Sequence, residues 1–200
     1  MGNICIFGDS IIWGAKLSFR VGWANLLRNY LESLDGEFFA VYDLGIDGNT
    51  TSNLIERFDV EAEARNPDIL FFAVGTNDSC FRKTKDNPEV DVETFERNLN
   101  KLISKAKRFS KNIVFVGLAK GNDSATIPLP RSITGKCYDK GNIKIYDSII
   151  KKICNKDGLV FIDINEELSD SDFEDGLHPN NVGHMKIFDK VKKNLDKIIK

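Results

Sequence analysis

Two polar motifs at opposite ends of this chain carry the residue types that acyl transfer needs. Gly-Asp-Ser at 8–10 follows an apolar run, and Asp-Gly-Leu-His stands at 175–178. A serine hydroxyl is a weak nucleophile unless an adjacent base takes its proton. His178 is one of only two histidines, which makes it the natural base for Ser10. Asp175 is suited to orient its ring, so the sequence predicts a Ser-His-Asp triad.

Two further segments supply hydrogen-bond donors for the same chemistry. Gly48 belongs to GIDGNT at 45–50, and Asn77 belongs to GTND at 75–78. The negative charge that develops on a carbonyl oxygen during acyl transfer is stabilised by N–H groups held in place beforehand. We therefore expect an oxyanion hole built from the backbone N–H groups of Ser10 and Gly48 and the side-chain amide of Asn77.

Each of these residues also has a plainer structural interpretation, since Gly, Asp, Asn and Ser are ordinary turn and cap residues. The chemical interpretation is favoured because several distant motifs supply complementary groups. Among their neighbours, Asp9 is expected to bond backbone groups of its own turn, and Asp78 to organise its loop. Gly75 is expected to support the segment that presents Asn77. The second histidine, His184, is expected to be a structural or solvent-facing residue of the last helix.

Strand-like and helix-like patterns alternate along almost the whole chain. The expected strands cover 3–8, 37–45, 68–75, 112–119 and 158–164, and the expected helices cover 23–34, a stretch opening at 49–58, 92–109, the residues around 146–153, and the C-terminal segment. This alternation predicts an α/β protein, a three-layer α/β/α sandwich around a five-stranded parallel sheet. Ligands of such sheets bind beyond the carboxyl ends of the strands, and the polar motifs follow those ends.

Four segments, read in order, resemble the sequence blocks of the GDSL/SGNH hydrolase family. They are FGDSIIWG (7–14), GIDGNT (45–50), GTND (75–78) and DGLHPN (175–180), and together they span nearly the whole chain. The resemblance implies a flavodoxin-like fold, the SGNH hydrolase fold, and a single SGNH hydrolase domain over 1–200. The family's usual leucine after the serine is replaced here by Ile11, a change that conserves side-chain volume.

The resemblance also implies a role for each site residue. The nucleophile falls on Ser10, the oxyanion residues on Gly48 and Asn77, the base on His178 and its acidic partner on Asp175. The resulting expectation is a serine esterase or acylhydrolase that cleaves carboxylic esters of small soluble substrates, such as short-chain acyl or acetyl esters. The reaction would pass through an acyl-enzyme intermediate. No metal and no cofactor are expected.

Other functions stay open at this point. A lysophospholipase, a thioesterase or an acyltransferase would use the same residues, and a non-catalytic ligand-binding domain would keep the same fold. A nucleotide- or flavin-binding protein is disfavoured, because the segment after the first strand has neither the glycines nor the hydroxyl run of a phosphate cradle.

Composition and charge exclude several classes of partner. The chain has 200 residues, a formal net charge of -2 and four cysteines without paired spacing. This charge balance gives no electrostatic reason to expect a nucleic-acid partner. No apolar run reaches transmembrane length, so no stable membrane association is expected. Without a signal-peptide pattern, the expected location is cytoplasmic. The cysteines indicate neither a zinc site nor disulfides, and the sequence does not predict an oligomeric state.

Surroundings of the site are predicted less directly. Trp13, Phe81 and the irregular segment Ala119–Lys136 are expected to wall the substrate pocket, with Cys80 as a thiol at its side. The segment DSDFEDG at 170–176 has the glycine of an EF-hand loop in the wrong place, so we expect a solvated loop there.

The C-terminal helix is expected to bury one apolar stripe and to expose its lysines. That stripe consists of Val182, Met185, Phe188, Val191, Leu195 and Ile198.

Overall fold

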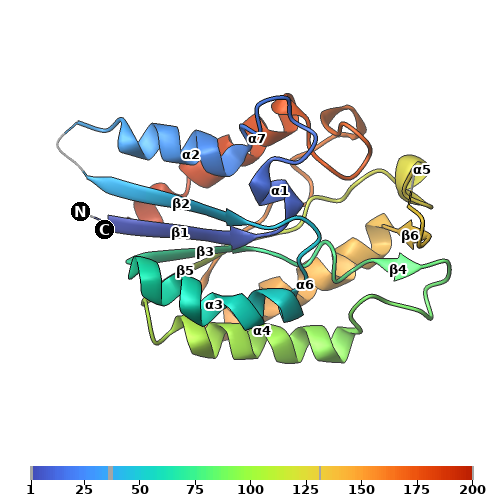
Figure 1. Ribbon diagram of the computed structural model, residues 1–200, viewed down its shortest axis with the longest axis horizontal. Helices are drawn as coiled ribbons and strands as arrows, with labels where there is room; N and C mark the ends of the chain where they lie inside the picture. Colours follow the sequence, from blue (N-terminus) through green and yellow to red (C-terminus); the bar gives the residue numbers. More distant parts are fainter. Residues whose placement is uncertain (1, 36–37, 131, 200) are drawn as a thin grey trace.

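The computed structural model describes residues 2–35, 38–130 and 132–199, and it shows a parallel sheet between two layers of helices (Figure 1). The strands of this sheet are β1 (Gly2–Gly8), β2 (Phe39–Gly45), β3 (Ile69–Ala73), β5 (Asn112–Val116) and β7 (Val160–Ile162). They form a five-stranded sheet in the order β2-β1-β3-β5-β7, in which every pair is parallel. This order confirms the predicted flavodoxin-like α/β/α sandwich. The expected start of the second strand, at 37, lies outside the described residues.

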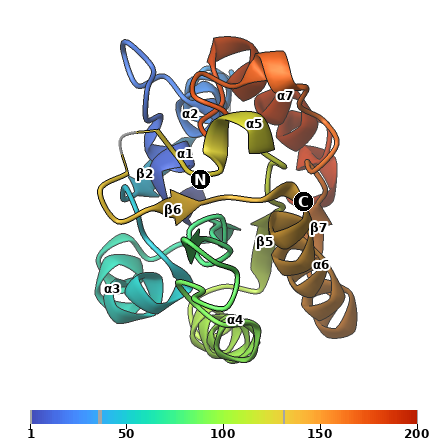
Figure 2. The same ribbon diagram turned by 90° about the vertical axis from the view of Figure 1, so that its right-hand side faces the viewer.

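Apart from the short α5 (Asp123–Thr126), the helices divide between the two faces of the sheet. The others are α1 (Ser10–Trp13), α2 (Trp23–Glu32), α3 (Thr51–Arg65), α4 (Val92–Ala106), α6 (Lys140–Asp157) and α7 (Asn181–Lys192). Helices α1, α2 and α7 cover one face, while α3, α4 and α6 cover the other (Figures 1 and 2). Among the described residues, no helix is long and apolar enough to cross a membrane.

Both faces of β1, an interior strand of the sheet, are buried, as an interior parallel strand requires. Its side chains alternate: Ile4 and Ile6 enter the core beneath α2 and α7, and Cys5 and Phe7 enter the core beneath α3 and α4. The Phe7 ring packs 5.1 Å from that of Phe58, centroid to centroid. Burying one such side chain contributes roughly 2–3 kcal/mol, so the two cores hold the strand ends in fixed positions.

Polar caps decide where several helices begin. Thr50, Asp91, Asp139 and Asn180 each accept a hydrogen bond from a backbone N–H of the first helical turn. Such a cap is typically worth about 1 kcal/mol. The cap at Thr50 agrees with the sequence-based assignment of a helix opening at 49–58, and it places the segment that contains Gly48 directly before α3.

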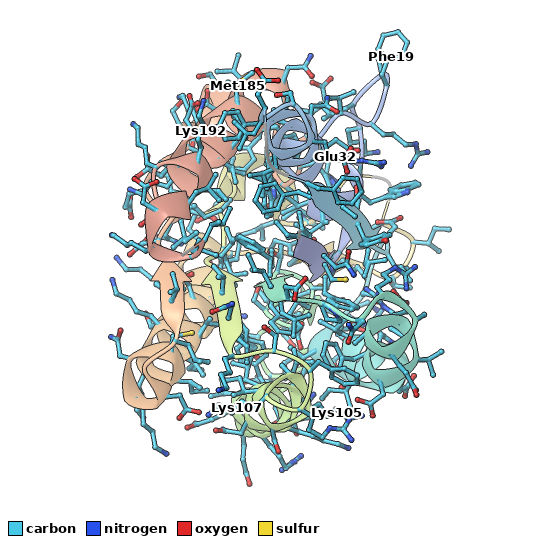
Figure 3. All side chains as sticks on the ribbon, turned by 90° about the vertical axis from the view of Figure 1, so that its left-hand side faces the viewer. Phe19, Glu32, Lys105, Lys107, Met185 and Lys192 are labelled. Carbon is cyan, nitrogen blue, oxygen red and sulfur yellow. The ribbon has the colours of Figure 1, made fainter. Side chains whose placement is uncertain are left out.

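The C-terminal segment departs from the predicted pattern. Helix α7 ends at Lys192 and is followed by a short 3-10 turn, Leu195–Lys197. The predicted buried stripe is wrong at Val182 and Met185, which are exposed; Figure 3 shows Met185 at the surface. The buried side is Gly183, His184, Ile187 and Val191. The reason is a close approach at the start of α7, where a Cβ on Gly183 would lie 2.5 Å from the Asp172 carbonyl oxygen.

A small two-stranded ribbon lies beyond the carboxyl edge of the main sheet, and the sequence did not indicate it. It pairs β4 (Phe81–Arg82) with β6 (Lys136–Cys137) in an antiparallel arrangement. Figure 2 shows this ribbon near α5 at the same end of the molecule as α1. The irregular segment Ala119–Lys136 is thereby held over the ends of the strands.

Candidate active site

Ser10 stands where β1 ends, as the first residue of α1. Asp9 caps this short helix, since its Oδ1 accepts a hydrogen bond of 3.0 Å from the N–H of Ile11. The end of β2 lies against α1 so closely that a Cβ on Gly45 would be 2.4 Å from the Trp13 nitrogen. Because residue 45 is a glycine, the end of β2 can pack directly against the turn that carries Ser10. The Ser10 side chain is therefore positioned by rigid neighbours.

His178 reaches Ser10 from the segment that precedes α7. Its Nε2 lies 3.1 Å from Ser10 Oγ, and its Nδ1 lies 2.9 Å from Asp175 Oδ2. Asp175 Oδ1 also accepts hydrogen bonds from the backbone N–H groups of Leu177 and His178. The structure therefore joins the serine, the imidazole and the carboxylate in one hydrogen-bonded chain across most of the sequence.

Asp175 is held in its ionised form. Burial opposes its charge, but hydrogen bonds from the side chain and backbone of His178 outweigh that effect and lower its pKa to about 2. An ionised carboxylate can only accept a hydrogen bond. The proton of the neutral imidazole therefore lies on Nδ1, which leaves Nε2 free to accept the Ser10 hydroxyl proton.

One pocket contains the serine and both expected oxyanion residues. Its volume is about 450 Å³, and Ser10, Gly48, Asn77 and His178 all line it. This size is within the range of small-molecule sites. Four segments that are far apart in the chain therefore meet at the carboxyl end of the sheet.

The amide of Asn77 is held at both ends. Its Nδ2 donates to the Asn49 carbonyl oxygen at 3.1 Å, and the Tyr138 hydroxyl donates to its Oδ1 at 3.0 Å. A carbonyl oxygen can only accept, so this pair of contacts determines which way the amide is turned. The remaining contact of Nδ2 is Asp9 Oδ2 at 3.5 Å, which is long for a hydrogen bond.

Tyr138 is a site residue that the sequence reasoning missed. It is buried, it lines the pocket, and it follows β6 directly. Thr126 holds it on both sides, because the Tyr138 N–H donates to the Thr126 carbonyl oxygen and the Thr126 hydroxyl donates to the Tyr138 carbonyl oxygen. A single tyrosine in an irregular segment carries no sequence signal for such a role, since only the β4–β6 pairing brings it to Asn77.

The three supporting residues, Asp9, Gly75 and Asp78, are not among the described residues that line the pocket, and they lie behind it. Asp78 accepts hydrogen bonds from the backbone N–H and the hydroxyl of Thr51, so it ties its loop to the start of α3. Burial raises the pKa of Asp78 to about 6 and that of Asp9 to about 7, against the opposing effect of their hydrogen bonds. The Gly75 carbonyl oxygen accepts from the N–H of Ser79, which closes the turn that carries Asn77.

The predicted pocket walls are correct only in part. Trp13 lines the pocket, and the segment Ala119–Lys136 contributes Leu129 and Lys136. Its residue 131 lies outside the described residues. The predictions for Phe81 and Cys80 are wrong: both side chains are buried and neither lines the pocket as described. Phe81 belongs to β4, whose pairing with β6 turns it inward, and burial raises the pKa of the Cys80 thiol.

The acidic segment at 170–176 is less solvated than predicted. Asp172 is buried, and its Oδ2 receives hydrogen bonds from Lys186 Nζ at 2.5 Å and from Ser169 Oγ at 2.7 Å. The Lys186 bond is the main reason that the pKa of Asp172 falls to about 2. Within the described ranges, no group of three or more His, Cys, Asp or Glu side chains is arranged to hold a metal ion.

Sequence comparisons place the chain among known proteins. The model of the GDSL-like lipase/acylhydrolase family matches residues 6–186. The chain is 29% identical over 112 residues to the uncharacterized lipoprotein YqeF of Bacillus subtilis (strain 168), covering 53% of this chain and 44% of that protein. It is 25% identical over 114 residues to an arylesterase of Vibrio mimicus, covering 57% and 53%. The matches thus span about half the length of these curated relatives.

Solved structures share the fold. The acetylxylan esterase Axe2 of Geobacillus stearothermophilus superposes with a TM-score of 0.77 at 20% identity, covering 97% of this chain and 94% of that one. LAE5, an alpha/beta hydrolase enzyme from the metagenome of Lake Arreo, Spain, gives a TM-score of 0.75 at 19% identity, covering 100% and 97%. The family model covers nearly the whole chain and confirms the resemblance read from its four sequence blocks. This protein therefore belongs to the GDSL-like lipase/acylhydrolase family.

Proposed function

We propose that this protein is a serine ester hydrolase that acts on small carboxylic esters through Ser10, His178 and Asp175. The observation that carries the proposal is the continuous hydrogen-bonded chain from Ser10 Oγ through both nitrogens of His178 to Asp175, open to a pocket of about 450 Å³. Family membership and the arylesterase and acetylxylan esterase names among its relatives support the same class of reaction.

In the proposed reaction, Ser10 Oγ attacks the ester carbonyl while His178 Nε2 takes its proton. Asp175, whose pKa is about 2, stays ionised and stabilises the imidazolium that forms. The imidazolium then gives the proton to the leaving alcohol as the bond between that alcohol and the acyl carbon breaks. The acyl group stays bonded to Ser10 Oγ. Water attacks this acyl-enzyme with His178 again as base, and the acid is released.

The oxyanion is stabilised by the N–H groups of Ser10 and Gly48 and by Asn77 Nδ2. Because the present contact of Nδ2 with Asp9 is long at 3.5 Å, an oxyanion can replace it with little loss. One such donor is worth about 3 kcal/mol of transition-state stabilisation. Tyr138 and Asn49 keep the amide turned toward this task.

The proposed substrates are short acyl esters, such as acetyl esters, because a pocket of this volume suits a small molecule. Transfer of the acyl group to an alcohol other than water would use the same residues. Product analysis in the presence of added alcohol separates the two reactions.

Labelling with a fluorophosphonate tests the proposal. The wild-type protein should gain one adduct by intact mass, mapped to Ser10 in a peptide digest, and should hydrolyse p-nitrophenyl acetate. Ser10→Ala should lose both. Ser148→Ala is a matched control, since this exposed serine lies on α6 and donates only to the Lys144 carbonyl oxygen. Equal turnover by folded wild type and Ser10→Ala would overturn the proposal.

A further inference from the structure

The wall of the pocket beyond Ser10 is rich in positive charge. Lys16, Arg20 and Lys136 line it, whereas Asp47 is the one carboxylate among its described lining residues. The chain as a whole has a formal net charge of -2, so this local excess runs against the overall balance. A cleft lined by one sign of charge attracts the opposite sign.

Arg20 differs from the other arginines that the structure describes. Each of the others has a hydrogen-bond acceptor or a carboxylate partner within the chain. The pairs are Arg28–Glu32, Arg57–Glu61, Arg65–Glu61 (carbonyl oxygen), Arg82–Glu89, Arg97–Glu93 and Arg108–Asp59. The Arg20 guanidinium makes no hydrogen bond and no ion pair with a described residue. It lies instead 3.4 Å from the centroid of the Trp13 ring. Its N–H donors are therefore available, while its position is set by the ring.

The backbone of Arg20 is also held in place. Its N–H donates to the Leu17 carbonyl oxygen, and its own carbonyl oxygen accepts from Asn25 Nδ2 at 3.2 Å. The turn folds back so closely that a Cβ on Gly14 would lie 2.7 Å from the Arg20 carbonyl oxygen. Arg20 has φ 53 and Lys16 has φ 69, a left-handed conformation that non-glycine residues adopt at a cost.

This loop carries Arg20 on the side of the pocket and projects Phe19 away from the body of the molecule (Figure 3). Phe19 is 90% exposed, whereas Trp13 at the pocket is 37% exposed. The loop therefore does not bury its own aromatic residue, and its ordered contact is the stack of Arg20 on Trp13 at the pocket wall.

We propose that the substrate is an anionic ester, and that Arg20, stacked on Trp13, binds its carboxylate while Lys16 and Lys136 add to the attraction. This inference rests on the proposed ester hydrolysis at Ser10 and names the substrate class of the same site. A guanidinium presents paired N–H donors that match a carboxylate, and stacking on an aromatic ring leaves those donors at its edge.

Matched pairs of esters test the inference. The probes are 4-acetoxybenzoate, whose alcohol half is anionic, and 4-acetoxybenzamide, its neutral counterpart of the same shape. Mono-4-nitrophenyl succinate and 4-nitrophenyl butyrate ask the same question of the acyl half. For wild type, kcat/KM should favour the anionic member of one pair by roughly tenfold, the size expected for one charge-assisted hydrogen bond. That preference should shrink in high salt.

Arg20→Gln should abolish most of the preference by lowering kcat/KM for the anionic ester far more than for the neutral ester. Arg20→Lys should keep part of it, because the charge remains while the planar fork is lost. Arg97→Gln is the control, since this arginine lies on α4 and pairs with Glu93. The same preference in wild type and Arg20→Gln would overturn the inference.

A binding measurement separates failure of the inference from failure of the proposed function. Calorimetric titration of Ser10→Ala with 4-acetoxybenzoate and with 4-acetoxybenzamide reports affinity without turnover. Tighter binding of the anion, lost in the Ser10→Ala, Arg20→Gln double variant, supports the anion subsite even if hydrolysis is absent. Turnover of all four esters without any preference for the anionic members supports the esterase and rejects the subsite.

Discussion

The two histidines of this chain lie close together in sequence and are both largely buried, yet their surroundings differ. His178 uses both nitrogens, with Asp175 Oδ2 at 2.9 Å and Ser10 Oγ at 3.1 Å, and it lines the pocket. His184, on the buried side of α7, accepts from the Trp23 N–H through Nδ1 at 3.1 Å. Its Nε2 is buried without a hydrogen-bond partner among the described residues.

The buried surroundings of His184 determine its pKa. Burial, followed by the charge of His178, lowers the pKa of His184 to about 4, so this ring stays neutral at physiological pH. At His178, a carboxylate on one side and a hydroxyl on the other supply the two partners that the proposed base needs. The difference between the rings is that His178 has two hydrogen-bond partners and lines a pocket, whereas the buried His184 has neither a second partner among the described residues nor a place in the lining of that pocket.

Replacing His178 should give the largest effect on activity. His178→Gln should lower kcat/KM for p-nitrophenyl acetate by roughly 10⁶-fold, as expected when the base of a triad is lost. The far-UV circular dichroism spectrum should not change. His184→Asn serves as the matched control and should keep activity near the wild-type value. Comparable losses in both variants would break the distinction between the two rings.

Removing the charge behind His178 should have the next largest effect. In Asp175→Asn, the amide oxygen can still accept from the backbone N–H groups, but the amide no longer stabilises an imidazolium. We expect kcat to fall by about 10⁴-fold, measured with the same ester. Asp170→Asn is the control, because this exposed carboxylate on the same segment pairs with Lys140. Unchanged kcat in Asp175→Asn would show that His178 works without this partner.

His184→Ala should instead reduce stability. The substitution leaves a cavity beside α2 and removes the acceptor of the Trp23 N–H, so the free energy of unfolding should fall by about 2–3 kcal/mol. Urea denaturation followed by fluorescence measures this change, and kcat/KM below the transition should equal that of wild type. A loss of activity without a loss of stability would contradict the structural assignment.

The lowered pKa of His184 also predicts how stability depends on pH. The unfolded ring takes up a proton below its ordinary pKa of 6.5, whereas the folded ring resists protonation down to about 4. The stabilisation is therefore complete above 6.5 and is lost as pH falls toward 4. From pH 7 to pH 5, protonation of the unfolded ring should therefore lower the free energy of unfolding by about 2 kcal/mol. In urea titrations, His184→Asn, which keeps an acceptor but does not titrate, should flatten this part of the curve.

The smallest effect is expected at Tyr138, whose hydroxyl donates a hydrogen bond to Asn77. Tyr138→Phe should lower kcat by roughly tenfold with little change in KM, since one neutral hydrogen bond that orients an oxyanion donor is lost. A double-mutant cycle provides the sharper measurement. In an Asn77→Ala background the same substitution should have no further effect on kcat, whereas a general loss of packing would reduce activity in both backgrounds.

The sequence by itself determined the α/β alternation, the order of the four polar motifs and the family. These features are encoded locally, because apolar period, turn residues and caps are read from neighbouring positions. The motifs for Ser10, Gly48, Asn77 and His178 were also readable one by one. Their placement at one end of the sheet followed from the rule that parallel strands end at the same edge.

Tertiary structure alone decided the contacts between segments that local patterns do not link. The β4–β6 ribbon brings Tyr138 to Asn77 and turns Phe81 inward, and the folded-back loop after α1 stacks Arg20 on Trp13. The buried side of α7 depended in the same way on how closely Gly183 approaches Asp172. Such contacts depend on how packed elements meet in space, and many pairings of an irregular segment satisfy the same local preferences equally well. Only the complete packing of the chain selects one of them.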